Sequence, residues 1–226
     1  MNRVGYLVNH KRGIEGERGI FYDYILASNG LFIEARGKMI AARVPVADAE
    51  VRGLAHLEPK VELCYGRIPQ RFFDLAVSAM MVDTSRERYM GVAWDYGYQL
   101  YVPEQETTGA SVQYSVGSDV VLDLHSHGNM GAFFSGTDNQ DEQGLRLYAV
   151  VGKLNETPVV KLRAGVYGYF YPLRWNDVFE GNLTDIVEFE KEEVTAESEL
   201  PSLDAPDPGH IGHRSGWLWW HRWLRR

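Results

Sequence analysis

The 226-residue chain contains 45% hydrophobic and 24% charged residues, a composition typical of a globular protein with one main domain and appendages. Its net charge of −8 leaves the body of the chain weakly acidic, which argues against a nucleic-acid-binding core because such cores carry a basic patch. Residues 1–6 do not open the apolar run of a secretory signal, and no stretch approaches the roughly 18 apolar residues of a spanning helix. The lone Cys64, interpreted as a small buried thiol, fits a reducing compartment. Together these features predict a cytoplasmic protein.

Residues 1–66 are predicted to form a β-rich N-terminal region. The segment ILASNGLFIEARGKMIAARVPV contains a strong turn pair at Asn29-Gly30 and a weaker one at Gly37-Lys38, so we expect a hairpin or meander there. His10 and His56 lack metal-ligand spacing and are interpreted as solvated or core histidines. No catalytic constellation is evident in this region.

A helix is predicted to begin near Pro69, in the segment PQRFFDLAVSAMMVD. Proline suits the first turn of a helix because its missing N–H has no partner to lose there. Phe72, Ala76 and Met80 share one face at helical spacing, which indicates a helix packed on a core.

Strands are predicted to follow this helix. ERYMGVAWD and GYQLYVP flank a turn at residues 95–97, and DVVLDLHSH precedes a glycine-rich loop. A short helix is expected from about Gly136 to Gly144, and RLYAVVGK and PVVKLRAGVYGYFY are expected to be one strand each, joined near Asn155. This order predicts an α+β fold over residues 67–184, with a mixed β-sheet flanked by helices.

The pattern H-x-H-x7-S-x-x-D is formed by His125, His127, Ser135 and Asp138. Two histidines two positions apart on a strand project from the same face, and a later carboxylate can fold back to join them. Three protein ligands with one open position are the arrangement of a catalytic zinc. Ser135 and Asp138 alone also match an S-x-x-D capping box, which requires no metal. Capping and metal ligation need not compete, because one geometry can serve both.

Asp123 lies on the same strand face as the two histidines. Its carboxylate is a candidate to accept a hydrogen bond from the free ring nitrogen of a ligand histidine and so fix the tautomer. A surface or salt-bridged aspartate is the alternative interpretation.

The C-terminal part of the chain changes composition twice. Residues 185–208 contain nine acidic residues and one lysine, which favours a linker. Residues 209–226 form an Arg/Trp-rich tail with four of the six tryptophans of the chain. We expect this tail to dock on a partner or on the chain itself rather than on a membrane, because a short segment with few cations binds lipid weakly.

The motif resembles the signature of the JAMM (JAB/MPN+) zinc metalloprotease family. That signature reads as a hydrophobic strand, HSHP, small and aromatic residues and S-x-x-D, and here the corresponding segments are VVLDL, HSHG, NMGAFF and SGTD. The resemblance implies a Zn²⁺ cofactor held by His125, His127 and Asp138, with Ser135 stabilising the oxyanion. It also implies a JAMM/MPN-like, cytidine-deaminase-like core over about residues 67–180. Gly128 stands where proline is usual, a departure that bears on substrate fit rather than on metal binding.

The family's catalytic base is a glutamate on a strand after the first helix, commonly followed three residues later by glycine. Glu87 fills this place, although Gly91 comes four residues later. A solvated glutamate at a strand end is the alternative for Glu87, and Asp83, Glu104 and Glu106 are the alternative bases.

The resemblance implies hydrolysis of the amide at the C-terminus of a ubiquitin-like (β-grasp) protein. In bacteria, an E1-like adenylating enzyme is a further implied partner, and the layout of the chain is also similar to protein A of the PRTRC systems of bacterial plasmids. Two alternatives remain open: a zinc amidohydrolase acting on another substrate, and a non-catalytic MPN-like scaffold or binding module.

Overall fold

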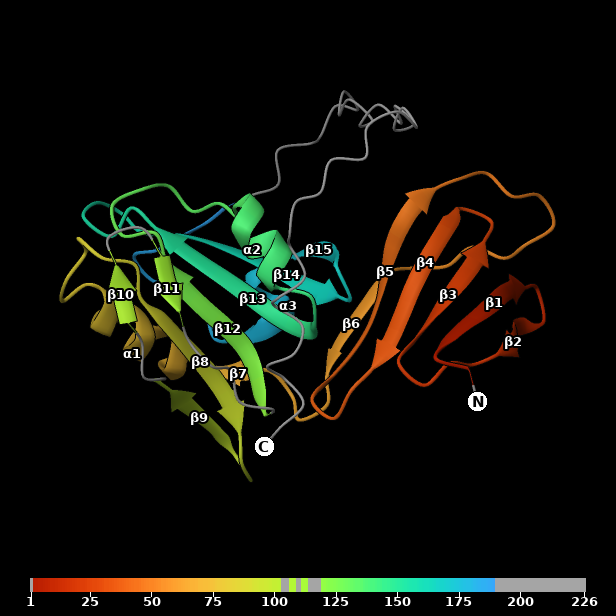
Figure 1. Cartoon of the computed structure of the whole chain (residues 1–226), viewed down its shortest axis with the longest axis horizontal. Coiled ribbons are helices and arrows are strands. Elements are labelled where there is room, and N and C mark those ends of the chain that lie inside the picture. The colour runs from red at the N-terminus through yellow and green to blue at the C-terminus, as the bar shows by residue number, and fades with distance from the viewer. Residues whose placement is uncertain (1, 103–105, 109–110, 114–118, 190–226) are drawn as a thin grey trace, which may run out of the picture. The chain divides into compact units, whose positions relative to one another are not determined.

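The computed structural model describes residues 2–102, 106–108, 111–113 and 119–189 (Figure 1), and only the backbone of residues 106–108 and 111–113. Met1–Lys191 form one compact unit. Most of the predicted acidic linker and the whole Arg/Trp-rich tail lie outside the described residues. The described part is rich in mixed β-sheet and has few helices, and none of its helices is long and apolar enough to cross a membrane.

The N-terminal residues form a sheet in the order β2-β1-β3-β4-β5-β6. Neighbouring strands are antiparallel except β1 and β3, which are parallel. The predicted meander over residues 25–46 is confirmed as part of β3, β4 and β5. The strands are β1 (Val4–His10), β2 (Gly13–Glu17), β3 (Tyr22–Ala27), β4 (Gly30–Arg36), β5 (Ile40–Asp48) and β6 (Lys60–Leu63).

The second sheet has the order β15-β14-β13-β12-β8-β9, and β17 pairs with β14 beyond the end of β15. β12 is parallel to β13 and antiparallel to β8. The strands of this sheet are β8 (Tyr89–Trp94), β9 (Tyr98–Tyr101), β12 (Val120–Ser126), β13 (Leu145–Gly152), β14 (Val159–Val166), β15 (Tyr169–Leu173) and β17 (Val187–Glu188). Two smaller ladders pair β10 (Glu106–Thr108) with β11 (Ser111–Gln113), and β7 (Ile68–Pro69) with β16 (Phe179–Glu180).

Three helices are present among the described residues: α1 (Arg71–Met80), α2 (Gly136–Asp141) and α3 (Trp175–Val178). The predicted first helix is confirmed as α1, but Pro69 does not occupy its first turn. Pro69 belongs to β7, which is held by its parallel pairing with β16, and Gln70 is the N-cap of α1. α2 ends earlier than predicted, at Asp141.

Two further predictions are wrong. The segment PVVKLRAGVYGYFY forms a hairpin of β14 and β15 rather than one strand, because Tyr167 and Gly168 both adopt positive φ (49° and 89°) and reverse the chain. Cys64 is exposed, not buried, because it directly follows the edge strand β6.

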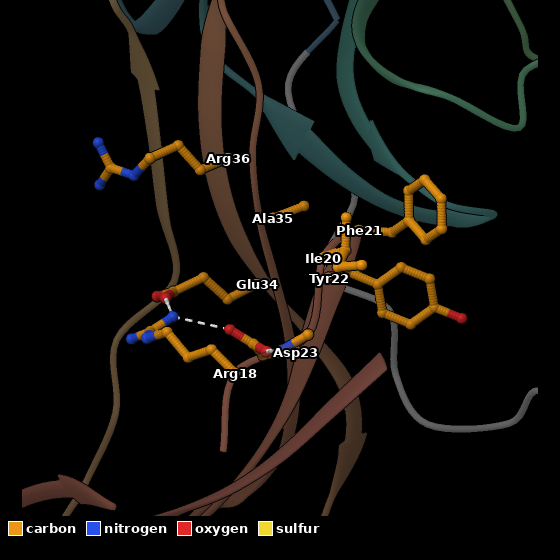
Figure 2. Close-up of a pocket in the computed structure, with 9 residues that line it drawn as sticks. Arg18, Ile20, Phe21, Tyr22, Asp23, Glu34, Ala35 and Arg36 are labelled. Atoms are coloured by element: carbon orange, nitrogen blue, oxygen red, sulfur yellow. Dashed lines mark hydrogen bonds and ion pairs between the residues drawn. The ribbon is translucent and has the colours of Figure 1, made fainter. Parts of the chain in front are cut away.

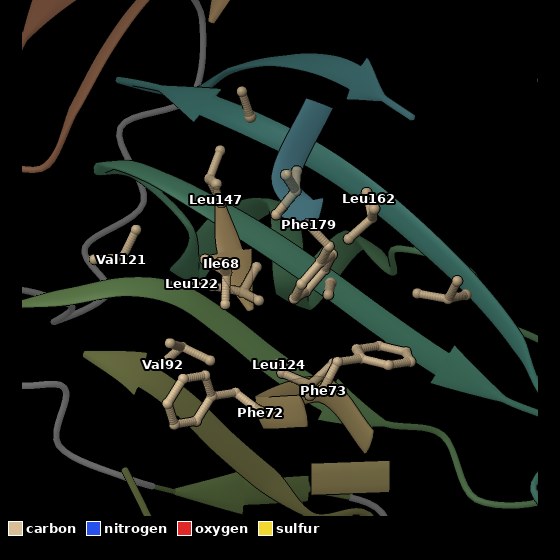
Figure 3. Packing of buried hydrophobic residues seen from close by; sticks show 14 of the residues in the cluster. Ile68, Phe72, Phe73, Val92, Val121, Leu122, Leu124, Leu147, Leu162 and Phe179 are labelled. Carbon is tan, nitrogen blue, oxygen red and sulfur yellow. The ribbon is translucent and has the colours of Figure 1, made fainter. Parts of the chain in front are cut away.

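The core lies between α1 and the second sheet (Figure 3). Leu122 and Leu124 of β12 are fully buried in the same apolar cluster as Phe73 of α1. Because side chains alternate along a strand, this packing turns Asp123 and His125 to the opposite face of the sheet. The helix therefore determines which face of β12 is left for chemistry.

The apolar cluster extends to the N-terminal sheet. Ile33 of β4 and Ile40 of β5 belong to it together with the residues packed under α1. The Oη atoms of Tyr24 and Tyr169, one from each sheet, lie 3.1 Å apart and form a hydrogen bond. The two sheets thus share buried apolar surface as well as polar contacts.

Candidate metal centre

The end of β12 is fixed on both sides by backbone contacts. Ser126 N donates to Arg88 O at 2.9 Å, and Arg88 N donates to Ser126 Oγ at 3.1 Å. On the other side, His127 N donates to Val151 O at 2.8 Å. His125 lies inside the strand and His127 lies just beyond its end. These bonds fix the positions of the two residues relative to each other.

The structure brings His125, His127 and Asp138 together. One potential ligand atom from each of the three lies within 4.8 Å of the other two. The Nε2 atoms of the histidines are 3.3 Å apart, and Asp138 Oδ1 is 3.7 Å from His125 Nε2. The convergence expected from the sequence motif is therefore present, while metal ligation itself stays a prediction.

Asp138 reaches this position from the first turn of α2. Ser135, the N-cap, donates its backbone N–H to Asp138 Oδ2 at 2.6 Å, and Asp138 N donates to Ser135 Oγ at 3.2 Å. The predicted capping box is confirmed. Because the cap uses Oδ2, the other carboxylate oxygen, Oδ1, is the one directed at His125.

Glycines allow the loop after His127 to pack closely. Gly128 has a φ of +57°, and a Cβ at this position would lie 2.4 Å from Thr84 O. Proline cannot adopt this conformation, because its ring fixes φ near −65°. The departure from the family's HSHP sequence thus has a backbone cause. Similarly, a Cβ on Gly152 would lie 2.4 Å from Ala132 N.

The donor set fits a divalent cation such as zinc. Two imidazole nitrogens and one carboxylate oxygen are ligands that zinc prefers. Burial lowers the pKa of His125 to about 4, against an opposing effect of Asp138, so the ring is neutral near pH 7 and offers a lone pair. His127 Nδ1 is buried and has no hydrogen-bond partner within the described part of the chain. A cation between these two imidazole nitrogens and the carboxylate oxygen would be bound by all three of them.

Glu87 lies beside this cluster. It is half-buried and precedes β8 by two positions, rather than lying within a strand as expected. Burial raises the pKa of its carboxyl, the charge of His127 opposes that shift, and Asp138 adds to it. Since both of these charges act on Glu87, its carboxyl lies near the cluster.

Of the three alternative bases, only Asp83 has a described side chain. The Asp83 carboxylate accepts hydrogen bonds from Ser85 N and Oγ at 3.1 and 2.5 Å, and these bonds lower its pKa. Glu104 and the side chain of Glu106 lie outside the described residues.

Asp123 follows one of its two sequence-based interpretations. Its Oδ1 accepts a hydrogen bond from Tyr89 Oη, and its Oδ2 accepts one from Arg146 Nη1 at 2.8 Å. Both oxygens are thus directed at donors from the neighbouring strands and not at a histidine ring. The salt-bridged alternative is the one that the structure supports.

The sequence analysis missed several residues around the cluster. The Phe133 ring lies 4.5 Å from the His127 ring, and the Phe134 ring lies 6.3 Å from the His125 ring. Buried Arg163 and Glu142 form an ion pair next to α2. The sequence signal for this pair is an arginine between Leu162 and Ala164, within a strand of mainly apolar residues.

A separate hollow of about 310 Å³ lies on the N-terminal sheet (Figure 2). Arg18 Nη1 there pairs with Asp23 at 2.7 Å and with Glu34 at 2.8 Å. These charges satisfy one another, so the hollow does not present a free charged group of this trio to a ligand. His56, also in the N-terminal part, is exposed and bonds to Glu58, which agrees with a solvated histidine.

Comparison with known families agrees with this geometry. Residues 77–164 match the family model described as prokaryotic homologs of the JAB domain. No curated protein gives a significant match to the chain. The matched segment includes Glu87 and all three residues of the cluster. Residues 77–164 are therefore similar to the prokaryotic JAB-domain family.

Proposed function

We propose that this protein is a zinc-dependent peptidase or isopeptidase of the JAMM type. The observation that carries the proposal is the convergence of His125, His127 and Asp138 within 4.8 Å, with the Glu87 carboxyl near enough for His127 and Asp138 to act on its pKa. The match to the JAB family supports it, because that family includes zinc metallopeptidases.

His125, His127 and Asp138 would hold the zinc, and the four-coordinate preference of zinc would leave one position for solvent or substrate. Bound zinc supplies Lewis-acid chemistry, which makes water acidic enough to act as a nucleophile near neutral pH. Glu87 accepts the proton of the attacking water and delivers it to the leaving amine. A pKa raised by burial suits this exchange, because a base works best when its pKa approaches the working pH.

Ser135 provides a hydrogen-bond donor for the developing oxyanion. Its Oγ accepts from Asp138 N, which leaves the hydroxyl hydrogen available to donate. Since the backbone N–H of Ser135 is bound to Asp138 Oδ2, the side chain is held beside Asp138. One capping box thus orients both a ligand and a donor.

The substrate that we propose is the C-terminal amide of a ubiquitin-like β-grasp protein, with an E1-like enzyme as a further partner. Family resemblance supports this substrate class. Exposed Met130 and Phe133 supply apolar contact next to the cluster, which suits an extended chain entering the site.

The test is cleavage of a β-grasp protein that carries a peptide tag fused to its C-terminus. The zinc-loaded protein is expected to release the tag at the last residue of the carrier, as read by intact mass. A chelator and the Glu87→Gln variant are both expected to stop the release. Binding without cleavage would instead favour the scaffold, and cleavage of another amide alone would favour the general amidohydrolase.

A further inference from the structure

Helix α2 carries Asp138, but it is not held in place by buried side chains of its own. It has six residues, and none of them is buried. Helices shorter than about 12–15 residues are marginal in water, and the capping box satisfies only the first turn. The contacts that fix Asp138 relative to His125 must therefore come from outside the helix.

Arg163, in the middle of β14, provides such contacts. Its Nη1 donates to Asn139 Oδ1 at 2.6 Å, and its Nε donates to Glu142 Oε2 at 2.9 Å. Its Nη2 donates to the same oxygen of Glu142. Asn139 directly follows Asp138, and Glu142 is the C-cap of α2. One guanidinium thus holds the helix at two points.

The same guanidinium is clamped by aromatic rings. Its Cζ lies 3.7 Å from the centroid of Phe134, the residue before Ser135, and 3.8 Å from that of Phe170 in β15. The side chains of Arg163 and Glu142 are each 8% exposed. An ion pair this buried adds little net stability, because desolvation offsets the attraction. The planar guanidinium does, however, fix the orientation of the groups that it binds. Its role is therefore to position these groups rather than to stabilise the fold.

We propose that Arg163 is a positioning residue of the metal centre. Through Asn139, Glu142 and Phe134 it holds residues 134–142 so that the Asp138 carboxylate meets His125 and His127. This inference rests on the proposed function, because it requires that the cluster binds a divalent cation. Loss of the Arg163 contacts should lower the affinity for the metal directly. A displaced Asp138 carboxylate would bind the cation more weakly even when no substrate is present.

The first test compares two exposed neighbours in α2, Asn139 and Gln140. Asn139→Ala removes a contact of Arg163 without creating an unpaired charge in the core, whereas Gln140→Ala changes the same helix and leaves that contact intact. Zinc affinity is measured by competition with a chromophoric chelator. Asn139→Ala is expected to bind zinc several-fold more weakly than Gln140→Ala, which should match the wild type. Equal affinities in the two variants would overturn the proposal.

The second test separates placement from stability. Arg163→Met alone leaves Glu142 buried without its partner, so it is expected to lower the melting temperature. The double variant Arg163→Met with Glu142→Leu removes both charges and is expected to regain stability. If placement is the role, its zinc affinity stays roughly 10–100-fold below that of the wild type, the usual range for groups that orient ligands.

The d–d absorption of the Co²⁺-loaded double variant should also differ from that of the wild type, since these bands report ligand geometry. Wild-type affinity and spectrum in a folded double variant would overturn the proposal, and if this variant does not fold, the Asn139→Ala comparison decides. A wild-type protein that binds no zinc would refute the proposed function itself. Zinc binding that is the same in every variant would refute only the role of Arg163.

Discussion

Glu87 shows how the surroundings of one residue can suit it to a task. Its side chain is half-buried close to the start of β8, and burial raises the pKa of its carboxyl above the ordinary glutamate value. A base must be deprotonated to act, so activity is expected to fall as the pH drops through this raised pKa. The acid limb of kcat/KM against pH should therefore lie above about 4.3, the ordinary glutamate pKa.

Replacing this carboxyl tests the assignment. Glu87→Gln preserves the shape of the side chain and removes its basicity, so it should keep its zinc and lose roughly 10²–10⁴-fold in turnover. Zinc content and kcat are measured on the same preparation. A Glu87→Gln protein with wild-type turnover would show that another group is the base.

Ser135 has two separable roles, which predict two different losses. Ser135→Ala removes the acceptor for Asp138 N, which should destabilise the protein by about 1 kcal/mol. It also removes the oxyanion donor, which should lower kcat by roughly 10²–10³-fold. Ser135→Thr keeps the hydroxyl and serves as the matched control in urea unfolding and in kinetics. Full activity in the alanine variant would remove Ser135 from the mechanism.

At the scale of elements, the loop after β12 depends on backbone conformation. Gly128 adopts a left-handed φ of +57°, and a Cβ there would lie only 2.4 Å from Thr84 O, so Gly128→Ala should destabilise the protein by more than about 1 kcal/mol. Gly131→Ala is the control, because a Cβ there meets no atom within 4 Å. Urea midpoints of the two variants decide, and equal midpoints would contradict the account.

Elements fixed by local signals could be predicted from the sequence. The turn at residues 95–97 joins β8 and β9 as expected, with Tyr96 at a φ of 51°. Helical periodicity located α1, and the alternation of β12 placed both histidines before the glycine-rich loop. The candidate site was predictable because its motif reflects two local geometries. The capping box relates Ser135 to Asp138, and the strand alternation relates His125 to His127.

Elements fixed by distant partners could not be predicted. Pro69 lies in β7 because it pairs with Glu180, far along the chain. Arg163 was missed for the same reason. Its structural role depends on contacts with Glu142 and two aromatic rings, which only the fold brings close to it. For Asp123 the sequence left a histidine partner and a salt bridge both open, because it does not reveal that Arg146 of the neighbouring strand reaches the carboxylate.

At the scale of the whole molecule, the two larger sheets share one apolar cluster, which contains Ile33 and Ile40 together with Leu122 and Phe73. Residues 1–191 are therefore expected to unfold cooperatively, in one calorimetric transition. Ile40, 2% exposed, is a suitable probe: Ile40→Ala should destabilise the protein by about 2–5 kcal/mol and move that single transition downward. Two separate transitions, with only one of them shifted, would contradict a shared core.

The claim on which the account depends is that one divalent cation is held by His125, His127 and Asp138. Metal analysis of the wild type beside His127→Ala and Asp138→Ala tests it most directly, with Asp141→Ala as the control because this residue is exposed in the same helix. The account predicts about one zinc per chain in the wild type and in Asp141→Ala, and little or none in the two ligand variants. The same zinc content in all four proteins would contradict it.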